Sequence, residues 1–113
     1  MTETYKVLGQ TLTGLNSAEI VIYKVPNAKQ TSISAIEITN SSSLSTTYTL
    51  AFVPSEESTQ LILKKHIAIY NKTIAPSETH EIKGGVTLAM GDQIRIYSTS
   101  NEIIANVYGV EIA

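Results

Sequence analysis

The sequence predicts a small all-β domain, an antiparallel β-sandwich of jelly-roll-like or immunoglobulin-like type. Isoleucine, valine, threonine and tyrosine dominate the apolar and semi-polar positions, and these residue types suit a pleated, half-buried surface. The apolar runs are short and turn signals recur about every ten residues, which is typical of sandwiches and barrels. A chain of 113 residues fits one domain, which we expect to span residues 1–113.

The turn signals divide the chain into about eight short strands. We expect these at residues 4–8, 19–25, 32–39, 46–53, 66–74, 78–82, 93–97 and 103–112. The first three are runs between turn signals in which β-branched and aromatic residues are frequent. In the fourth, Tyr48, Leu50 and Phe52 occupy alternate positions, so we expect one face of that strand to point inward.

Residues 56–66, before and at the start of the fifth strand, are ambiguous. Ser55 or Ser58 could cap a helical turn, and Glu56 and Glu57 would suit the N-terminal end of a helix. The β-branched neighbours favour the edge of a strand. A strand edge is therefore the prediction, and a single helical turn is the alternative.

The last third of the chain predicts strand, glycine turn, strand, turn and strand. The pairs Gly84-Gly85 and Gly91-Asp92 supply positions that tolerate φ > 0, which tight hairpins need. We therefore expect one turn at the first pair, after the strand at 78–82, and another turn at the second pair.

The two strands that follow differ in their alternation. Ile94 and Ile96 share one face of the strand at 93–97, while Arg95 and Tyr97 take the other. In the final strand apolar residues occur on both parities. That strand is expected to be buried on both faces or to be broken by a bulge at Gly109.

Composition limits the possible partners. The chain has no cysteine, which excludes disulfides and thiolate metal sites. Its formal net charge is −2 and Arg95 is its one arginine, so we expect no nucleic-acid partner. The N-terminus shows no basic leader followed by an apolar stretch, which predicts no signal peptide and synthesis in a host cytoplasm. The apolar runs are shorter than the ~20 residues that cross a bilayer, so no membrane partner is expected.

The acidic residues do not suggest an active site. A carboxylate pair for acid–base chemistry needs two acids brought together, and the one aspartate, Asp92, follows Gly91 in a turn. We expect Asp92 to bond backbone amides of that turn. The nine glutamates are scattered along the chain, and each is expected to be an exposed strand side chain.

The histidines and serines give no stronger signal. His66 and His80 could share a metal with Glu78 or Glu81, but such a site needs at least three convergent ligands and no HExxH spacing is present. A surface position is therefore expected for both histidines. No Gly-x-Ser-x-Gly motif occurs, and the glycine pair at 84–85 lacks a phosphate-binding context. We accordingly assign no residue to catalysis, to a cofactor or to a metal.

Basic and aromatic residues point instead to contacts with partners. The pair Lys64-Lys65 suits a solvated strand end or a partner contact better than a nucleic-acid site. The chain has six tyrosines, one phenylalanine and no tryptophan. Tyrosine packs its ring and still hydrogen-bonds at its tip, which favours it as an interface anchor.

The order and spacing of several segments are distinctive. They are residues 5–10, 23–26, 36–40, 48–54, 86–97 and 108–112. Together these segments resemble a family of small tailed-bacteriophage virion proteins, and the resemblance covers nearly the whole chain. It implies a structural component of the phage particle with a jelly-roll-like or immunoglobulin-like sandwich and no catalysis. In such a protein Gly9, Pro26, Gly91, Asp92 and Gly109 would serve the fold.

The expected function is that of a non-enzymatic capsid-decorating or cementing subunit in the virion, assembled as a homo-oligomer on the major capsid protein. Such a subunit acts in many copies, each with a modest interface. A tail, baseplate or neck component is the first alternative. A carbohydrate-binding module is a second one, and the lack of tryptophan weakens it.

Overall fold

The computed structural model describes residues 3–12, 19–57, 62, 64–100 and 102–112. Eight strands make up most of this part of the chain. They are β1 (Glu3–Leu12), β2 (Ile20–Lys24), β3 (Gln30–Asn40), β4 (Thr46–Val53), β5 (Ile67–Ile74), β6 (Thr79–Leu88), β7 (Gln93–Ser98) and β8 (Ile103–Ile112). Two short 3₁₀ turns, η2 (Ser55–Glu57) and η3 (Lys64–His66), lie between β4 and β5.

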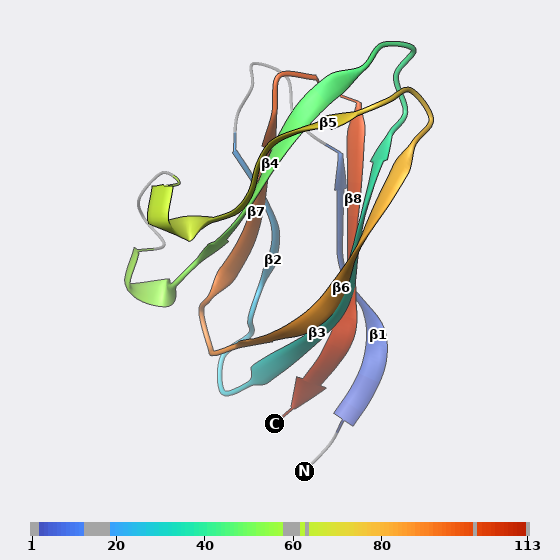
Figure 1. Cartoon of the computed structure of the whole chain (residues 1–113). Coiled ribbons are helices and arrows are strands. Elements are labelled where there is room, and N and C mark those ends of the chain that lie inside the picture. Colours follow the sequence, from blue (N-terminus) through green and yellow to red (C-terminus); the bar gives the residue numbers. More distant parts are fainter. Residues whose placement is uncertain (1–2, 13–18, 58–61, 63, 101, 113) are drawn as a thin grey trace.

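The strands form two four-stranded sheets, in the orders β1-β8-β3-β6 and β2-β7-β4-β5 (Figure 1). All pairings are antiparallel, and β1 pairs with β8, β2 with β7, β3 with β6 and β4 with β5. This is a long hairpin rolled into two layers, the jelly-roll arrangement. An immunoglobulin domain orders its strands differently. The predicted antiparallel sandwich is confirmed, and of its two alternatives the strand order selects the jelly roll.

The core lies between the two sheets. Tyr48, Leu50, Ile94 and Ile96 are buried in it, and Phe52 packs partly buried against the same cluster. The inward faces predicted for β4 and β7 are therefore confirmed. The other large side chains that are fully buried are Val25, Ile33, Ile36, Ile38, Val53, Ile74, Ile103 and Val107. Burial of each such aliphatic side chain stabilises the fold by about 1.5–3 kcal/mol.

The predicted turn at Gly84-Gly85 is wrong, because β6 runs through this pair without ending. The two glycines lie in a β-bulge, where they oppose the single residue Ser34 of β3. Gly85 has a φ of 110°, which a glycine adopts without steric cost. Bulges and hairpins both use such positions, so the glycine pair alone does not distinguish them.

The strand edge predicted across 56–66 is also wrong where the structure describes it, and the helical-turn alternative is correct for η2. The turn is held by Glu57, whose amide donates to Pro54 O over 3.0 Å. His66 belongs to η3, so the fifth strand begins one residue later than expected. Ser58, the second proposed cap, lies outside the described residues.

Strand β8 is neither broken at Gly109 nor buried on both faces. Its side chains alternate between buried and half-buried along the whole strand. The bulges lie in its two neighbours, at Leu8 of β1 and at Ser34 of β3. A Cβ atom at Gly109 would come within 2.2 Å of Ser32 O, so the glycine allows β3 to approach closely at its bulge.

Candidate interaction surface and polar sites

The outward side of sheet β1-β8-β3-β6 carries an apolar stripe along β8. Buried residues of β8 alternate with a half-buried set that points away from the core. In register with this second set, Tyr108 faces Val7 of β1 on one side and Ala35 of β3 on the other. We call the resulting apolar surface the outer patch. It consists of Val7, Ala35, Tyr108, Val110 and Ile112, with Ile104 further along β8 beyond the polar Asn106.

Polar groups surround the outer patch. The Tyr108 hydroxyl donates to Glu37 Oε1 over 2.9 Å, and Gln30 and Ser32 flank the C-terminal half of β8. Val7, at the edge of the patch, remains 46% exposed. An apolar centre with a polar rim is the usual anatomy of a protein–protein interface.

Part of the outward side of the other sheet is occupied by the chain itself. Turns η2 and η3 lie beside β4 (Figure 1). Beneath them Arg95 is buried, with Nε donating to Gln93 Oε1 over 2.8 Å and Nη1 to Glu19 Oε1 over 3.1 Å. Glu19 Oε2 in turn accepts the Ile62 amide over 2.8 Å. Arg95 lies on the face of β7 opposite Ile94 and Ile96, as predicted, but its side chain is buried there rather than exposed to solvent.

His66 is buried, so the surface position expected for it is wrong. Turn η3 folds the ring back onto η2, where His66 Nε2 contacts Glu57 Oε2 and Lys65 Nζ lies 2.6 Å from Glu57 Oε1. Hydrogen bonds from Lys65 and His66 hold the pKa of Glu57 below its ordinary value. The three side chains therefore fasten one short turn to the other.

His80 lies between the sheets, at the side of the sandwich where β5 and β6 face each other. Its Nδ1 is 2.8 Å from the Tyr48 hydroxyl and its Nε2 is 3.1 Å from Glu78 Oε1. Glu78 also accepts the Ala75 amide, and this hydrogen bond is the main reason why the pKa of Glu78 is lowered. Because a carboxylate only accepts, Nε2 donates to Glu78, and in the tautomer with its proton on Nε2 the Nδ1 atom accepts a hydrogen bond from the Tyr48 hydroxyl.

Tyr48 and His80 line a depression of about 540 Å³ between β5 and β6. The Tyr48 side chain is only 1% exposed, and burial together with the Glu78 charge raises its pKa. Both ring nitrogens of His80 are engaged. The arrangement therefore ties β4 of one sheet to β6 of the other and presents no exposed nucleophile.

The proposed metal ligands are only partly brought together. His80 contacts Glu78, but Glu81 faces outward opposite Glu37, and His66 lies on the far side of the other sheet. In the described part of the chain no group of three or more His, Cys, Asp or Glu side chains could hold a metal ion.

Glu111 is not the exposed strand residue that was expected. It is 9% exposed, and the Tyr23 hydroxyl donates to its Oε2 over 2.6 Å. The same hydroxyl is 2.8 Å from Thr31 Oγ1. Burial and Glu111 raise the pKa of Tyr23 far above its ordinary value, which keeps the hydroxyl a donor. The pair links β2 to β8 across the sandwich.

Asp92 bonds backbone amides, as predicted, and it does so in two segments. Its Oδ2 accepts the Ala89 amide of its own turn over 2.9 Å, and its Oδ1 accepts the Ser55 amide at the start of η2 over 3.0 Å. The neighbouring Gly91 has a φ of 84°. Asp92 thus fixes both the turn before β7 and the position of η2.

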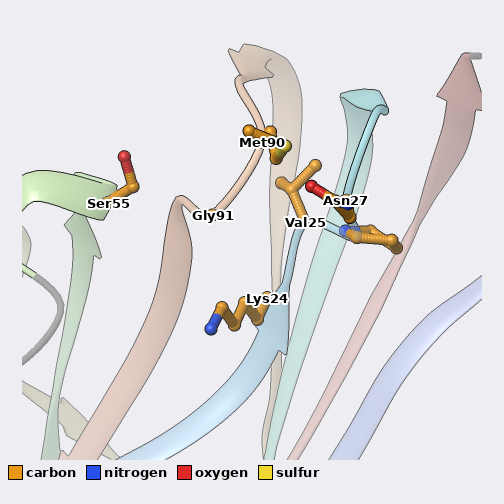
Figure 2. A pocket seen from close by; sticks show the side chains of 7 residues that line it. Lys24, Val25, Asn27, Ser55, Met90 and Gly91 are labelled. Carbon is orange, nitrogen blue, oxygen red and sulfur yellow. The ribbon is translucent and has the colours of Figure 1, made fainter.

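An open depression of about 400 Å³ lies at this end of the sandwich (Figure 2). Figure 2 shows Val25, Asn27 and Met90 gathered on one side and Ser55 on the other, with the Lys24 ammonium directed away from the Met90 group. The Ala28 amide donates to Met90 Sδ over 3.1 Å. The labelled side chains include no acid–base pair, so we assign no chemistry to this depression.

Comparison with protein-family models, with curated proteins and with solved structures finds no match. None of the described helical segments is long and apolar enough to cross a membrane.

Proposed function

We propose that this chain is a non-enzymatic structural subunit of a tailed-bacteriophage particle, which decorates or cements the capsid through contacts with the major capsid protein. Two lines of argument support this. Ordered segments along nearly the whole sequence resemble such virion proteins, and the jelly roll carries an apolar outer patch that no described segment covers. The outer patch is the observation that carries the proposal, because an uncovered apolar surface rimmed by polar groups marks a site of assembly with other protein subunits, a second copy of this chain included.

The polar side chains of the molecule support a structural role. Tyr48–His80, Tyr23–Glu111 and Arg95–Glu19 each join segments that are distant in the sequence. These groups are occupied with one another rather than directed into a shared cavity. Surface and shape are what a decorating subunit needs, since many weak contacts on one lattice add to a stable attachment.

Electron microscopy of the parent particle tests the proposal. We expect density for the jelly roll, repeated over the capsid lattice. Density confined to one vertex, or to the tail, would contradict capsid decoration. It would support the alternative of a tail, baseplate or neck component with the same fold.

One observation favours a second candidate function, carbohydrate binding. Tyr70 on β5 is 71% exposed and borders a depression of about 380 Å³ together with Lys64 and Ile67. An exposed aromatic ring beside a basic group can pack against a sugar and hydrogen-bond to it. Retention of a glycan on an array at millimolar affinity or better, lost in Tyr70→Ala, would establish this function, whereas the capsid proposal predicts no retention.

A further inference from the structure

The outer patch lies on a sheet that is large enough for a stable interface. Strands β1, β6 and β8 have 10 residues each and β3 has 11. At about 3.3 Å per residue and about 4.8 Å between strands, the sheet presents a face of roughly 600 Å². Two such faces in full contact would bury about 1,200 Å², which is the lower limit of the range for specific interfaces.

The patch is also suited to meet a copy of itself. Its centre is formed by Tyr108 and Val110. Among the described side chains, the charges near it are Glu37, which accepts from Tyr108, and the Glu81–Lys83 pair on β6. Face-to-face packing about a two-fold axis brings apolar residues onto apolar residues and leaves these charges toward the rim. Such isologous contacts are the commonest form of oligomer in soluble proteins.

Edge-to-edge pairing of two sandwiches is disfavoured in the described part of the chain. Each of the outermost strands of the two sheets contains a bulge: at Leu8 in β1, Ile22 in β2, Tyr70-Asn71 in β5 and Gly84-Gly85 in β6. Bulges interrupt the free backbone ladder and so disfavour pairing of one edge with another. On the outward face of the second sheet, η3 contacts β4 and Arg95 is buried, so this part of the face is covered.

We infer that two copies of this chain associate through the outer patch, with sheet β1-β8-β3-β6 of one copy packed on the same sheet of the other about a two-fold axis. Tyr108 and Val110 lie at the centre of this interface. The inference deepens the proposed function, because it rests on the homo-oligomeric assembly that a capsid-decorating subunit was expected to have. In such a dimer the outer patch is buried between the two copies, and surfaces outside the patch contact the capsid.

Sedimentation of the full chain tests the interface. We expect a dimer at micromolar concentration, and a monomer for Val110→Lys, because the lysine ammonium would be buried without a partner. Leu44→Lys is the matched control, since Leu44 is a 73% exposed apolar residue in a loop, and it should remain dimeric. A monomeric native chain, a trimer, or a dimer that Val110→Lys does not dissociate would overturn the inference.

A second variant keeps the test decisive if Val110→Lys does not fold. The chain has no cysteine, so a single introduced thiol reports only on contacts between copies. We expect a short bismaleimide to link Val110→Cys into dimers and to leave Leu44→Cys monomeric. Equal linking of both variants, or of neither, would contradict the two-fold interface.

The two proposals fail separately. A dimer through the outer patch in a chain that is absent from the capsid lattice would preserve the interface and overturn the capsid role. A chain that decorates the lattice but is monomeric in solution would preserve the capsid role and overturn the interface.

Discussion

Tyr48 and His80, one from each sheet, share a hydrogen bond of 2.8 Å within the sandwich. Their rings lie 5.7 Å apart between centroids and are tilted by 54°. The contact joins β4 to β6 next to the depression between β5 and β6, where the outermost strands of the two sheets face each other. The buried hydroxyl therefore fixes the distance between the sheets at this side.

Removal of that hydroxyl should destabilise the fold. In Tyr48→Phe, His80 Nδ1 loses its partner, and we expect a loss of about 1 kcal/mol in the free energy of unfolding. Tyr70→Phe is the control, because that side chain is 71% exposed and should change stability by less than about 0.5 kcal/mol. Urea denaturation measures both, and equal effects would show that the hydrogen bond between the sheets contributes nothing.

A methyl group at Gly109 should be poorly tolerated. Its Cβ would lie 2.2 Å from Ser32 O, so β3 and β8 would have to separate, at a cost of about 1–3 kcal/mol or more. Asn106→Ala, at a half-buried outward position of the same strand, should change stability by less than about 0.5 kcal/mol. A Gly109→Ala variant as stable as the native chain would show that the approach of the two strands is not required.

Loss of Arg95 should leave the Glu19 carboxylate half-buried without its cation. We expect Arg95→Met to lower the free energy of unfolding by on the order of 2–3 kcal/mol. Arg95→Lys should recover only part of this, because an ammonium cannot reproduce the geometry of the guanidinium toward Gln93 and Glu19. A double-mutant cycle with Glu19→Gln isolates the pair, and additive effects would contradict the coupling.

Acid should weaken the attachment of η2 to η3. The pKa of Glu57 is lowered from an ordinary value of 4.5 by hydrogen bonds from Lys65 and His66. A carboxyl whose pKa is lower in the folded state stabilises the fold above its unfolded pKa, and this contribution is lost as the pH falls through the folded value. The melting temperatures of the native chain and of Glu57→Gln should therefore differ near neutral pH and converge as the pH falls below 4.5 and through the lower folded pKa. A difference that does not depend on pH would contradict this account.

Local patterns in the sequence predicted the strands but not the order in which they pair. Alternation placed Tyr48, Leu50, Ile94 and Ile96 in the core correctly, because side-chain direction in a strand depends only on position. The choice between jelly roll and immunoglobulin sandwich depends on contacts such as that of β1 with β8, which no local pattern encodes. The pair Gly84-Gly85 was misassigned because a bulge and a turn need the same backbone freedom.

The candidate sites were harder to predict than the strands. The outer patch had a signal in the apolar residues on both parities of β8, which was interpreted as burial on two faces or a bulge at Gly109. Tyr48 and His80 are 32 residues apart, and Tyr23 and Glu111 are 88 residues apart, so only the fold brings each pair together. Glu111 and His66 were expected at the surface because ionisable side chains are seldom buried unless they are paired.

The number of copies of this chain per particle tests the central proposal most directly. Quantitative mass spectrometry of purified virions would measure that number relative to the major capsid protein. A capsid-decorating subunit should be present in an amount comparable to the major capsid protein, in a fixed ratio to it. Only a few copies per particle, or none, would contradict a role on the capsid lattice.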